Sequence, residues 1–359
     1  MEFRVLDEDF VQVHVLDVFE SAIWTDRFFE AGDFKIKLPL TADNYEYVLV
    51  GRYVWNSMSD RIMMIEKIVI DSSSEEGSMM TISGRSLEYL MFRRIIWGQR
   101  RHQTNLHDTI KAMIMENMVA PSDGARAMSW LTWEDNSDSR LSSIQVDIQH
   151  TGDNLYTAVT ELLEKHHVGI AFLYDGPGQI RIRLEAGVDR SYSQSTNSFV
   201  VFSPRFDNLI SGRFASDIST LKTVALVGGP GEGSARIYET VSSGATGGWN
   251  RREVFINASS VRDKDDDNNT IPESTVRANL REEGTTKLGL SENQHLIEFD
   301  GETAEHTMYQ YGVDYRIGDI VQIQDSNGFN IPTRLIEFIQ SHDQSEVKFY
   351  PTFKQDSKK

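Results

Sequence analysis

The sequence predicts a β-rich α+β fold in which two strand-rich regions are separated by an inserted α/β region. Three observations predict it. Apolar and polar residues alternate through much of the first hundred residues, as they do in half-buried strands. From about residue 101 the apolar spacing changes to that of helices. Strand-like alternation returns at residue 198, and the end of the chain repeats a pattern found near its start.

The composition indicates a folded and acidic protein. The chain has 359 residues, with 36 Lys and Arg against 54 Asp and Glu, and a net charge of −18. With 39% hydrophobic residues it can form a substantial core, and its length suits two or three domains. The negative charge disfavours general nucleic-acid binding because it repels phosphate. The lack of cysteine excludes disulfides, thiolate zinc sites and cysteine nucleophiles.

Neither export nor a membrane anchor is expected. The first residues, MEFRVLDEDF, are acidic where a signal peptide needs a basic and then an apolar segment. No apolar run in the sequence approaches the roughly 18 residues that cross a bilayer. We therefore expect a protein that is made in the cytoplasm.

The first hundred residues are predicted to form an antiparallel sheet or small barrel. Residues 10–19 alternate in part, and residues 34–40 alternate cleanly between apolar and charged side chains. Two further strands are expected at 61–71 and 78–83, joined by a polar turn at 72–77. Such alternation implies one buried and one wet face, which is typical of antiparallel sheets.

Two helices are predicted in the middle of the chain. Asn105 is the expected N-cap of the first, in which apolar residues recur every four positions until Pro121 ends it. The second begins at Asp153 or Asn154 and is expected to end at Gly169, because glycine commonly terminates helices. Two short strands should follow, at 169–174 and 179–184.

The rest of the chain is again rich in predicted strands. They are expected at 198–203, at 213–227 and throughout 295–353. A glycine-rich and acidic region occupies residues 228–269. One more helix is predicted from Pro272 or Glu273 to about Gly284.

Two of the strand-rich regions resemble each other. In each, a Gly-x-x-Val segment is followed by a strand containing Ile-Glu, a polar turn and another strand. The first copy starts at Gly51 and the second at Gly318, and the matching glutamates, Glu66 and Glu337, lie 15 and 19 positions later. Four extra residues fit a longer hairpin at 325–329. Because such short patterns also recur by chance, both a coincidence and a true internal repeat remain open at this point.

Residues 228–234 have the glycine spacing of a phosphate-binding loop. They lack the required lysine, because Ser234 directly follows Gly233. Residues 236–241 look like a strand, so no helix N-terminus would face an anion. An ordinary loop is the preferred interpretation.

A second segment suggests a calcium loop, with Asp263, Asp265, Asp267 and Asn268 at alternating or adjacent positions. Asn268 stands where such a loop needs glycine, and a serine stands at the place of its final bidentate glutamate. We therefore prefer an exposed acidic loop, with opportunistic cation binding as the alternative.

The histidines do not form a metal-binding pattern. His166 and His167 are adjacent, so on a helix they point about 100° apart. His102 and His107 are five positions apart, with no carboxylate in register. We expect histidines at surfaces or helix ends.

Enzyme signals are weak. Glu66 and Glu337 end strand patterns, and Glu161 and Glu164 are expected to face solvent on a helix. The sequence contains no Gly-x-Ser-x-Gly nucleophile elbow. We therefore predict no catalytic, cofactor-binding or metal-binding residues.

One basic cluster stands out, formed by Arg93, Arg94, Arg100 and Arg101 around Trp97. A nucleic-acid patch is one interpretation. In so acidic a chain, pairing with acids of a neighbouring subunit or domain is the preferred one.

The order of several short motifs resembles that of the siphophage tail hub family, whose members are also called tail-associated or baseplate hub proteins. The motifs are WTDR at 24–27, GDFKIKLP at 32–39, ISGRSL at 82–87, NLY at 154–156, FS to NL at 202–209, VGG at 227–229, residues 309–315, GDIV at 318–321 and YPTF at 350–353. They cover nearly the whole chain. The resemblance implies a fold similar to the central hub of contractile-phage baseplates, in which each subunit carries two tube-type β-barrels.

The resemblance also implies a homotrimer. Three subunits with two barrels each present six similar barrels, so a three-fold ring can dock on a six-fold tail tube. The expected domains are the first barrel at 1–100, the α+β insert at 101–197, the second barrel at 198–243 and 291–353, a loop and helix completing the insert at 244–290, and a basic tail at 354–359. Many relatives continue into fibre, peptidase or sugar-binding regions; this chain ends shortly after Phe353, so those activities are not expected.

We therefore predict a non-enzymatic structural hub of a phage tail tip that lines the DNA ejection channel. The expected partners are a tail tube or distal tail ring, a tape measure protein and downstream tip or fibre proteins, while DNA passes without specific binding. The expected location is the virion, after assembly in the host cytoplasm. The alternatives are a tail-tip cell-wall hydrolase or a carbohydrate-binding adhesin, and the equivalent hub of a phage-derived injection particle. Because an acidic wall does not attract DNA, part of the −18 charge is expected to line the lumen.

Overall fold

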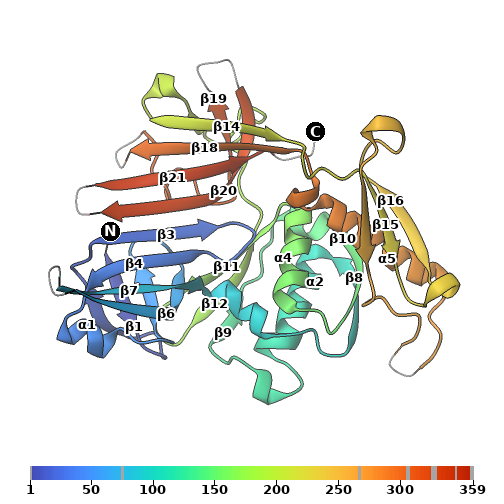
Figure 1. Cartoon of the computed structure of the whole chain (residues 1–359), viewed down its shortest axis with the longest axis horizontal. Helices are drawn as coiled ribbons and strands as arrows, with labels where there is room; N and C mark the ends of the chain where they lie inside the picture. Colours follow the sequence, from blue (N-terminus) through green and yellow to red (C-terminus); the bar gives the residue numbers. More distant parts are fainter. Residues whose placement is uncertain are drawn as a thin grey trace.

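The computed structural model describes residues 2–73, 77–265, 268–304, 308–324, 330–343 and 346–355. Within them, most strands belong to a single 13-stranded sheet, and the rest form three small sheets. The large sheet lies beside two helical and mixed regions (Figure 1). This confirms the predicted β-rich α+β class.

The first module is built from alternating strands around its own core. Phe34, Ile36 and Leu38 are buried on one face of their strand, while the residues between them are exposed or half-buried, as predicted. Strands also form at Phe3–Leu6 and Ser21–Arg27, where none was predicted, while Gln12–Leu16 lies within the strand predicted at 10–19. The elements are β1 (Phe3–Leu6), β2 (Gln12–Leu16), β3 (Ser21–Arg27), β4 (Asp33–Pro39), α1 (Ala42–Tyr47), β5 (Tyr53–Asn56), β6 (Ile62–Ser73) and β7 (Gly77–Ser86).

The second module repeats this plan late in the chain. Its core is aromatic and includes Phe202, Phe299, Phe338 and Phe353. The strands are β13 (Val201–Phe202), β14 (Ser211–Asp217), β18 (Leu296–Ala304), β19 (Ile320–Gln324), β20 (Asn330–Asp343) and β21 (Val347–Lys354).

The two modules share one sheet because β3 pairs with β20. The order across the sheet is β14-β18-β21-β20-β3-β4-β7-β6-β5-β1-β2, with β19 paired to β20 and to β13. Arg27 lies opposite Glu337 in this joint, and Ser21 lies opposite Asp343. The red strands of the second module therefore run beside the blue strands of the first (Figure 1).

The internal repeat is real, with one correction. Gly51 and Gly318 both have positive φ, at 93° and 89°. The N–H of Gly51 donates to the carbonyl of Ile65 (2.9 Å), and the N–H of Gly318 donates to that of Leu335 (2.8 Å). Ile65 therefore corresponds to Leu335, so Glu66 of the first module corresponds to Ile336 of the second and not to Glu337. The glycine precedes its partner by 14 residues in one copy and 17 in the other. The extra length was predicted at 325–329, which lie outside the described residues.

The insert after the first module contains a mixed α/β structure, as predicted. Asn105 and Asn154 cap its two main helices by accepting hydrogen bonds from the N–H groups of Asp108 (2.9 Å) and Thr157 (3.3 Å). The elements are η1 (Leu87–Arg93), β8 (Gln99–Asn105), α2 (Leu106–Ile114), the π-helical turn η2 (Met115–Val119), η3 (Gly124–Arg126), β9 (Leu131–Trp133), α3 (Ser139–Ser143), β10 (Gln145–Thr151), α4 (Leu155–Lys165), β11 (Gly169–Tyr174) and β12 (Ile180–Glu185).

The predicted end of the second helix is wrong. α4 ends at Lys165, and His167 rather than Gly169 adopts the left-handed conformation, with φ of 53°. Gly169 instead begins β11 and lies against the ring of Phe28. Glycine is needed there because a side chain would overlap that ring, and not because a helix ends.

A small three-stranded sheet with one helix forms a separate unit at the side of the insert (Figure 1). Its elements are β15 (Val224–Gly228), β16 (Tyr238–Ser242), β17 (Glu253–Asn257) and α5 (Glu273–Gly289), and its core includes Ala225, Val227, Ile256 and Leu280. The remaining short helical turns are η4 (Pro204–Phe206), η5 (Gly233–Ala235), η6 (Gly248–Asn250) and η7 (Ser291–Asn293).

This unit corrects two predictions. The single strand expected at 213–227 is two strands, β14 and β15, which lie in different sheets. β15 pairs with β16 and β17 of the small sheet and not with the second module. The helix α5 also continues past Gly284 to Gly289, because Gly284 faces Val227 and Val241 in the packed interface.

Candidate functional site

The glycine-rich segment at 228–234 is a loop, as the sequence indicates. It leads through the short turn η5 into β16, with no long helix behind it. The guanidinium of Arg236 donates hydrogen bonds to the carbonyls of Gly228 (2.9 Å) and Gly229 (3.0 Å). Because these carbonyls already accept from Arg236, this face of the loop is occupied by a cation of the chain itself.

The acidic loop forms a tight turn. The carboxylate of Asp265 accepts a hydrogen bond from the N–H of Asn269 (2.8 Å), and Asn268 has φ of 63°. Asp267 lies outside the described residues. Among the described residues, no group of three or more His, Asp or Glu side chains is placed to hold a metal ion.

The histidines occupy helix ends and packed surfaces. His166 follows the last residue of α4, and His107 lies in the first turn of α2, where it contacts Asp108 (3.0 Å) and Asp135 (3.7 Å). The spacing of His102 and His107 in the sequence did not indicate these two carboxylates, which the fold brings to His107. His102 lies on β8, before α2, and burial lowers its pKa.

Half of the basic cluster is paired within the insert. Arg100 contacts Glu116 (3.2 Å), and Arg101 forms a bidentate pair with Asp147 across β8 and β10. In the part of the chain that the structure describes, neither Arg93 nor Arg94 forms an ion pair with a carboxylate. Within the chain, Arg100 and Arg101 thus pair with acids of the insert itself.

The glutamates on α4 form ion pairs with other parts of the chain and do not simply face solvent. Glu161 forms an ion pair with Lys287 of α5, and Glu164 lies 3.9 Å from Lys354 of β21. The sequence prediction for both was wrong, because α4 packs between α5 and the second module.

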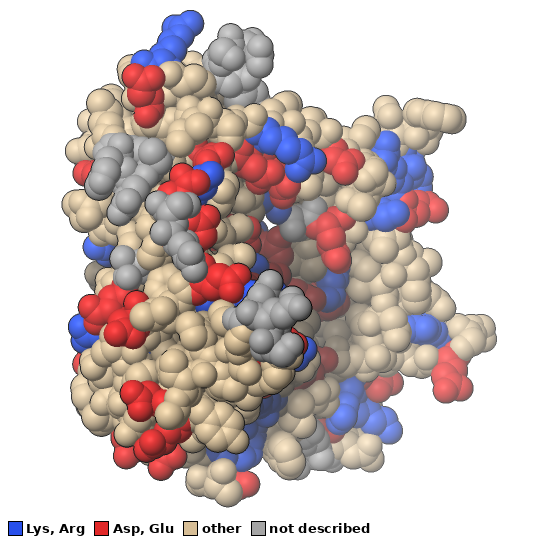
Figure 2. Space-filling model, turned by 60° about the vertical axis from the view of Figure 1, so that its left-hand side comes forward, with Lys and Arg blue, Asp and Glu red and all other residues tan. Residues whose placement is uncertain are grey.

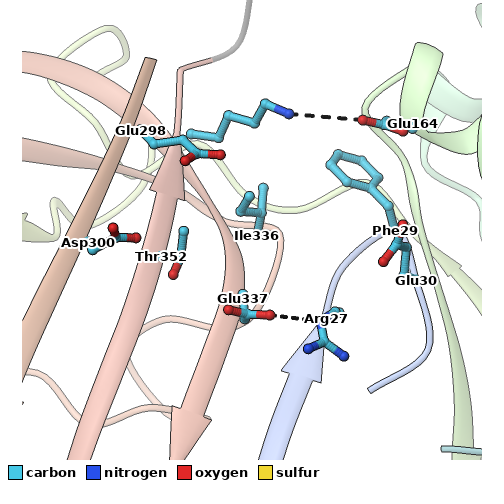
Figure 3. Close-up of a pocket in the computed structure, with 10 residues that line it drawn as sticks. Arg27, Phe29, Glu30, Glu164, Glu298, Asp300, Ile336, Glu337 and Thr352 are labelled. Atoms are coloured by element: carbon cyan, nitrogen blue, oxygen red, sulfur yellow. Dashed lines mark hydrogen bonds and ion pairs between the residues drawn. The ribbon is translucent and has the colours of Figure 1, made fainter. Parts of the chain in front are cut away.

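A pocket of about 410 Å³ lies where the joint between β3 and β20 meets α4 (Figure 3). Arg27 pairs there with Glu337 (2.7 Å) and with Asp33. Burial raises the pKa of Glu298, and Lys354 opposes this effect. The lining residues are Arg27, Phe29, Glu30, Glu164, Glu298, Asp300, Ile336, Glu337, Thr352 and Lys354.

Five of the residues that line the pocket are acidic: Glu30, Glu164, Glu298, Asp300 and Glu337. Figure 2 shows Asp and Glu side chains, with some Lys and Arg beside them, at a hollow in the middle of one face of the molecule. The ion pairs inside the pocket tie the first module to the second, and Glu164 adds the insert. The geometry is that of a polar joint between three parts of the chain.

A buried ionic network forms the other side of this joint. Arg61 lies 3.4 Å from Glu88 and donates a hydrogen bond to the carbonyl of Arg27 (2.9 Å). Glu88 also accepts from the N–H of Phe172 on β11 (2.9 Å). Burial alone would lower the pKa of Arg61, but Glu88 and Asp26 outweigh it, so the pKa is raised. The network therefore holds a charged arginine between the first module and the insert.

Asp26 is the second acid of this network. It is buried, and burial raises its pKa to about 6 despite the opposing effects of Arg61 and of the hydrogen bond from Trp24. The hydroxyl of Ser59 also donates to it (3.3 Å).

Phe28 is an apolar wedge at the same junction. It is completely buried directly after β3, and its ring lies against Gly169 of the insert and Gly318 of the second module. A Cβ atom on either glycine would overlap the ring. The guanidinium of Arg334 lies 5.5 Å from the ring centroid. One side chain of the first module thus contacts both other parts.

The sequence predicted none of these junction residues as a site. Their partners are far apart in the chain, so no local spacing marks them. The described helices include none that is long and apolar enough to cross a membrane.

Comparison with solved structures shows that this architecture is shared with tail proteins. The prophage tail protein gp18 from Listeria monocytogenes matches 100% of this chain and 96% of its own, with a TM-score of 0.55 at 14% identity. The 43 kDa tail protein of prophage MuSo2 from Shewanella oneidensis matches 98% of both chains, with a TM-score of 0.56 at 13% identity. The Francisella PdpA–VgrG complex contains a chain of which 58% is covered, against 100% of this one, with a TM-score of 0.53 at 9% identity.

Sequence comparison identifies the family. A search of curated proteins gives no match. Residues 2–353 match the family described as Siphovirus ReqiPepy6 Gp37-like protein, which confirms the resemblance to siphophage tail proteins. Because the match spans nearly the whole sequence, the chain belongs to this Gp37-like siphovirus family.

Proposed function

We propose that the chain is the structural hub of a phage tail tip or baseplate. In this proposal three copies form a ring that adapts the six-fold tail tube to the three-fold tip and surrounds the channel through which DNA leaves. Membership of a siphovirus family and the fold shared with phage tail proteins support a role in the tail. The proposed role needs no catalytic residue, cofactor or metal.

The observation that carries the proposal is the internal repeat and its joint. The two modules share the strand order β5-β6-β7-β4-β3 and β19-β20-β21-β18-β14. They meet edge to edge through β3 and β20, so one sheet continues from module to module. If the same type of joint also forms between copies, three chains place six similar modules in one closed ring.

The acidic surface supports a channel through which DNA slides. DNA carries one negative charge per about 1.7 Å of duplex axis, and a basic wall would bind it by releasing its counterions. An acidic wall offers no such attraction. In the proposed ring, part of the −18 net charge lines the lumen. Mapping the acids on an experimental ring structure and finding all of them on the outside would refute this part.

The proposed partners are the tail tube or a distal tail ring on one side, and tip or fibre proteins on the other, with the tape measure protein in the channel. The proposed location is the tip of the virion tail.

The experiment is the mass of the purified chain by light scattering over a wide range of protein concentrations. The proposal predicts an assembly three times the mass of the 40.9 kDa chain, alone or after mixing with its tube or distal-tail partner. A monomer or dimer under both conditions would contradict the ring.

A cell-wall hydrolase is the second candidate, because Glu298 has a raised pKa in a pocket that also holds Asp300 and Glu337. A raised pKa is what a general acid requires. A hydrolase would clear a peptidoglycan gel and lose that activity in the Glu298→Gln variant. The hub proposal predicts no clearing by either protein.

A further inference from the structure

Two segments at sheet edges are left with one strand neighbour. Within the described residues, β14 pairs only with β18. β5 covers β6 only as far as Met64, so residues 67–73 of β6 pair with β7 on one side and with no described strand on the other. Exposed strand edges of this kind attract other strands.

The joint inside the chain provides a template for these two edges. Gly84 lies opposite Ile65, and Phe353 lies opposite the matching Leu335, which aligns β7 with β21. In this alignment residues 67–73 of β6 correspond to 337–343 of β20, the part that pairs with β3. Trp24 of β3 faces Phe34, and Phe214 of β14 faces Phe299. Phe34 lies opposite Gly84 and Phe299 lies opposite Phe353, so Phe34 and Phe299 also correspond. Residues 211–217 of β14 therefore correspond to 21–27 of β3.

We propose that β14 of one copy pairs antiparallel with residues 67–73 of β6 in the next copy, in the register in which β3 pairs with β20. The inference rests on the proposed ring, and it identifies the surfaces and the register by which copies of this chain meet. It places Phe214 opposite Ile70, Arg213 opposite Asp71 and Asp217 opposite Lys67.

Apolar side chains support this register. In the internal joint, Trp24 and Gln340 lie opposite each other and are both 0% exposed. Their counterparts Phe214 and Ile70 are 45% and 42% exposed, although each lies on the core-facing side of its strand. Pairing in the proposed register covers the ring of Phe214 and the side chain of Ile70. Burial of apolar surface of this kind favours association.

Charge complementarity supports the same register. Arg27 and Glu337 form an ion pair in the internal joint (2.7 Å). Their counterparts are Asp217 and Lys67, so the pair is retained with its signs exchanged. Arg213 and Asp71 add a second pair of opposite charges. Neither Lys67 nor Asp71 has an ion-pair partner among the residues described.

Other registers lose these matches. A shift of two residues places Asp217 opposite either Val69 or Ile65, and Arg213 opposite either Ser73 or Val69. A shift of one residue turns the side chains of one strand to the other face of the sheet. It also places Asp217 opposite Ile68 or Glu66.

The absence of cysteine from the sequence allows a direct test. Val69→Cys and Ala215→Cys introduce one thiol on each edge, directly opposite in the proposed register. Oxidation of the double variant is expected to give covalent trimers on a non-reducing gel. A mixture of the two single variants is expected to give only cross-linked dimers, which shows that the bond joins separate copies.

The matched control is Val69→Cys with Arg213→Cys, which face each other only after a shift of two residues. It is expected to cross-link much less than the proposed pair, and circular dichroism checks that all variants are folded. If the protein has the mass of a trimer but the control pair cross-links as well as or better than the proposed pair, the proposed register is wrong. The proposed ring is not contradicted by that result. A protein with no trimer under any condition contradicts the proposed function itself.

A charge reversal gives an independent readout in the protein without cysteines. Asp71→Arg faces Arg213 in the proposed register and is expected to weaken association roughly fivefold per joint, the effect of about 1 kcal/mol. Adding Arg213→Asp restores opposite charges and is expected to restore association. Equal association of all three proteins, or no rescue in the double variant, overturns the proposed pairing of these residues.

Discussion

At the scale of single residues, Asp26 makes stability depend on pH. Its pKa is raised to about 6 in the folded protein, mainly by burial, against 3.8 for an ordinary aspartate. The folded state therefore prefers the protonated acid. The stability that this preference contributes is fully present below pH 3.8 and is lost as the pH rises through about 6.

The Asp26→Asn variant should remove this dependence. Relative to the variant, the natural chain is expected to lose on the order of 3 kcal/mol of unfolding free energy between pH 4 and pH 8, the value of about two pKa units. Urea unfolding across this pH range measures it. The same change at the exposed neighbour Asp60 is the control. Parallel pH profiles for the natural chain and Asp26→Asn would show that Asp26 does not titrate in this way.

Phe28 and Gly169 provide a second prediction for single residues. Gly169→Ala adds a methyl group that overlaps the Phe28 ring, so it is expected to destabilise the chain by about 1–3 kcal/mol, as overpacking does. The loss should be smaller when Phe28→Leu is also present, because the two residues share one contact. Urea unfolding of the single and double variants measures both effects.

The control for this pair is Gly124→Ala. Gly124 begins a short surface turn, and a Cβ atom there would meet no other atom within 4 Å. Its stability should change by less than about 0.5 kcal/mol. Equal losses for Gly124→Ala and Gly169→Ala, or strict additivity with Phe28→Leu, would argue against a steric wedge.

The residues of this junction show why local sequence does not reveal the candidate site. The glycine at 169 was interpreted as a helix end, since local sequence offers that explanation. Its actual reason is Phe28, which lies far away in the chain. Asp26, Arg61 and Glu88 likewise carry no common spacing, because only the folded chain brings them together.

At the scale of elements, the helix caps read from the sequence are confirmed and testable. Asn154→Ala removes the acceptor at the start of α4 and also the hydrogen bond from its amide to the carbonyl of Phe92 (2.9 Å). A loss of about 1 kcal/mol is expected. Asn154→Asp keeps the cap and should lose less, as measured by urea unfolding. A larger loss for Asp than for Ala would contradict the capping role.

Elements with strong local signals were predicted well. The strands β4, β11 and β12 and the starts of α2 and α4 follow from alternation and from capping asparagines. The segment 213–227 was not predicted correctly, because its apolar residues lie in two different sheets. Which sheet a strand joins depends on distant partners, and sequence periodicity contains no information about them.

At the scale of the whole molecule, the order of strands explains how one chain can present two similar modules. The repeat was visible in the sequence through Gly51 and Gly318, but their match was shifted by one residue at the glutamates. The bulges support the corrected match: the register slips between Ile65 and Lys67 in one copy and between Leu335 and Glu337 in the other, so Glu66 and Ile336 occupy the same position in the two modules. The pairing of β3 with β20, which the sequence did not reveal, turns two modules into one continuous sheet.

The most direct test of this account is an electron cryo-microscopy image of the assembled protein, viewed along its symmetry axis. The account predicts a closed ring with three-fold symmetry and six similar modules around an open centre. Within it, joints inside a chain should alternate with joints between chains. A ring with another number of chains, or an assembly in which the second module does not contact the first module of its neighbour, would contradict it.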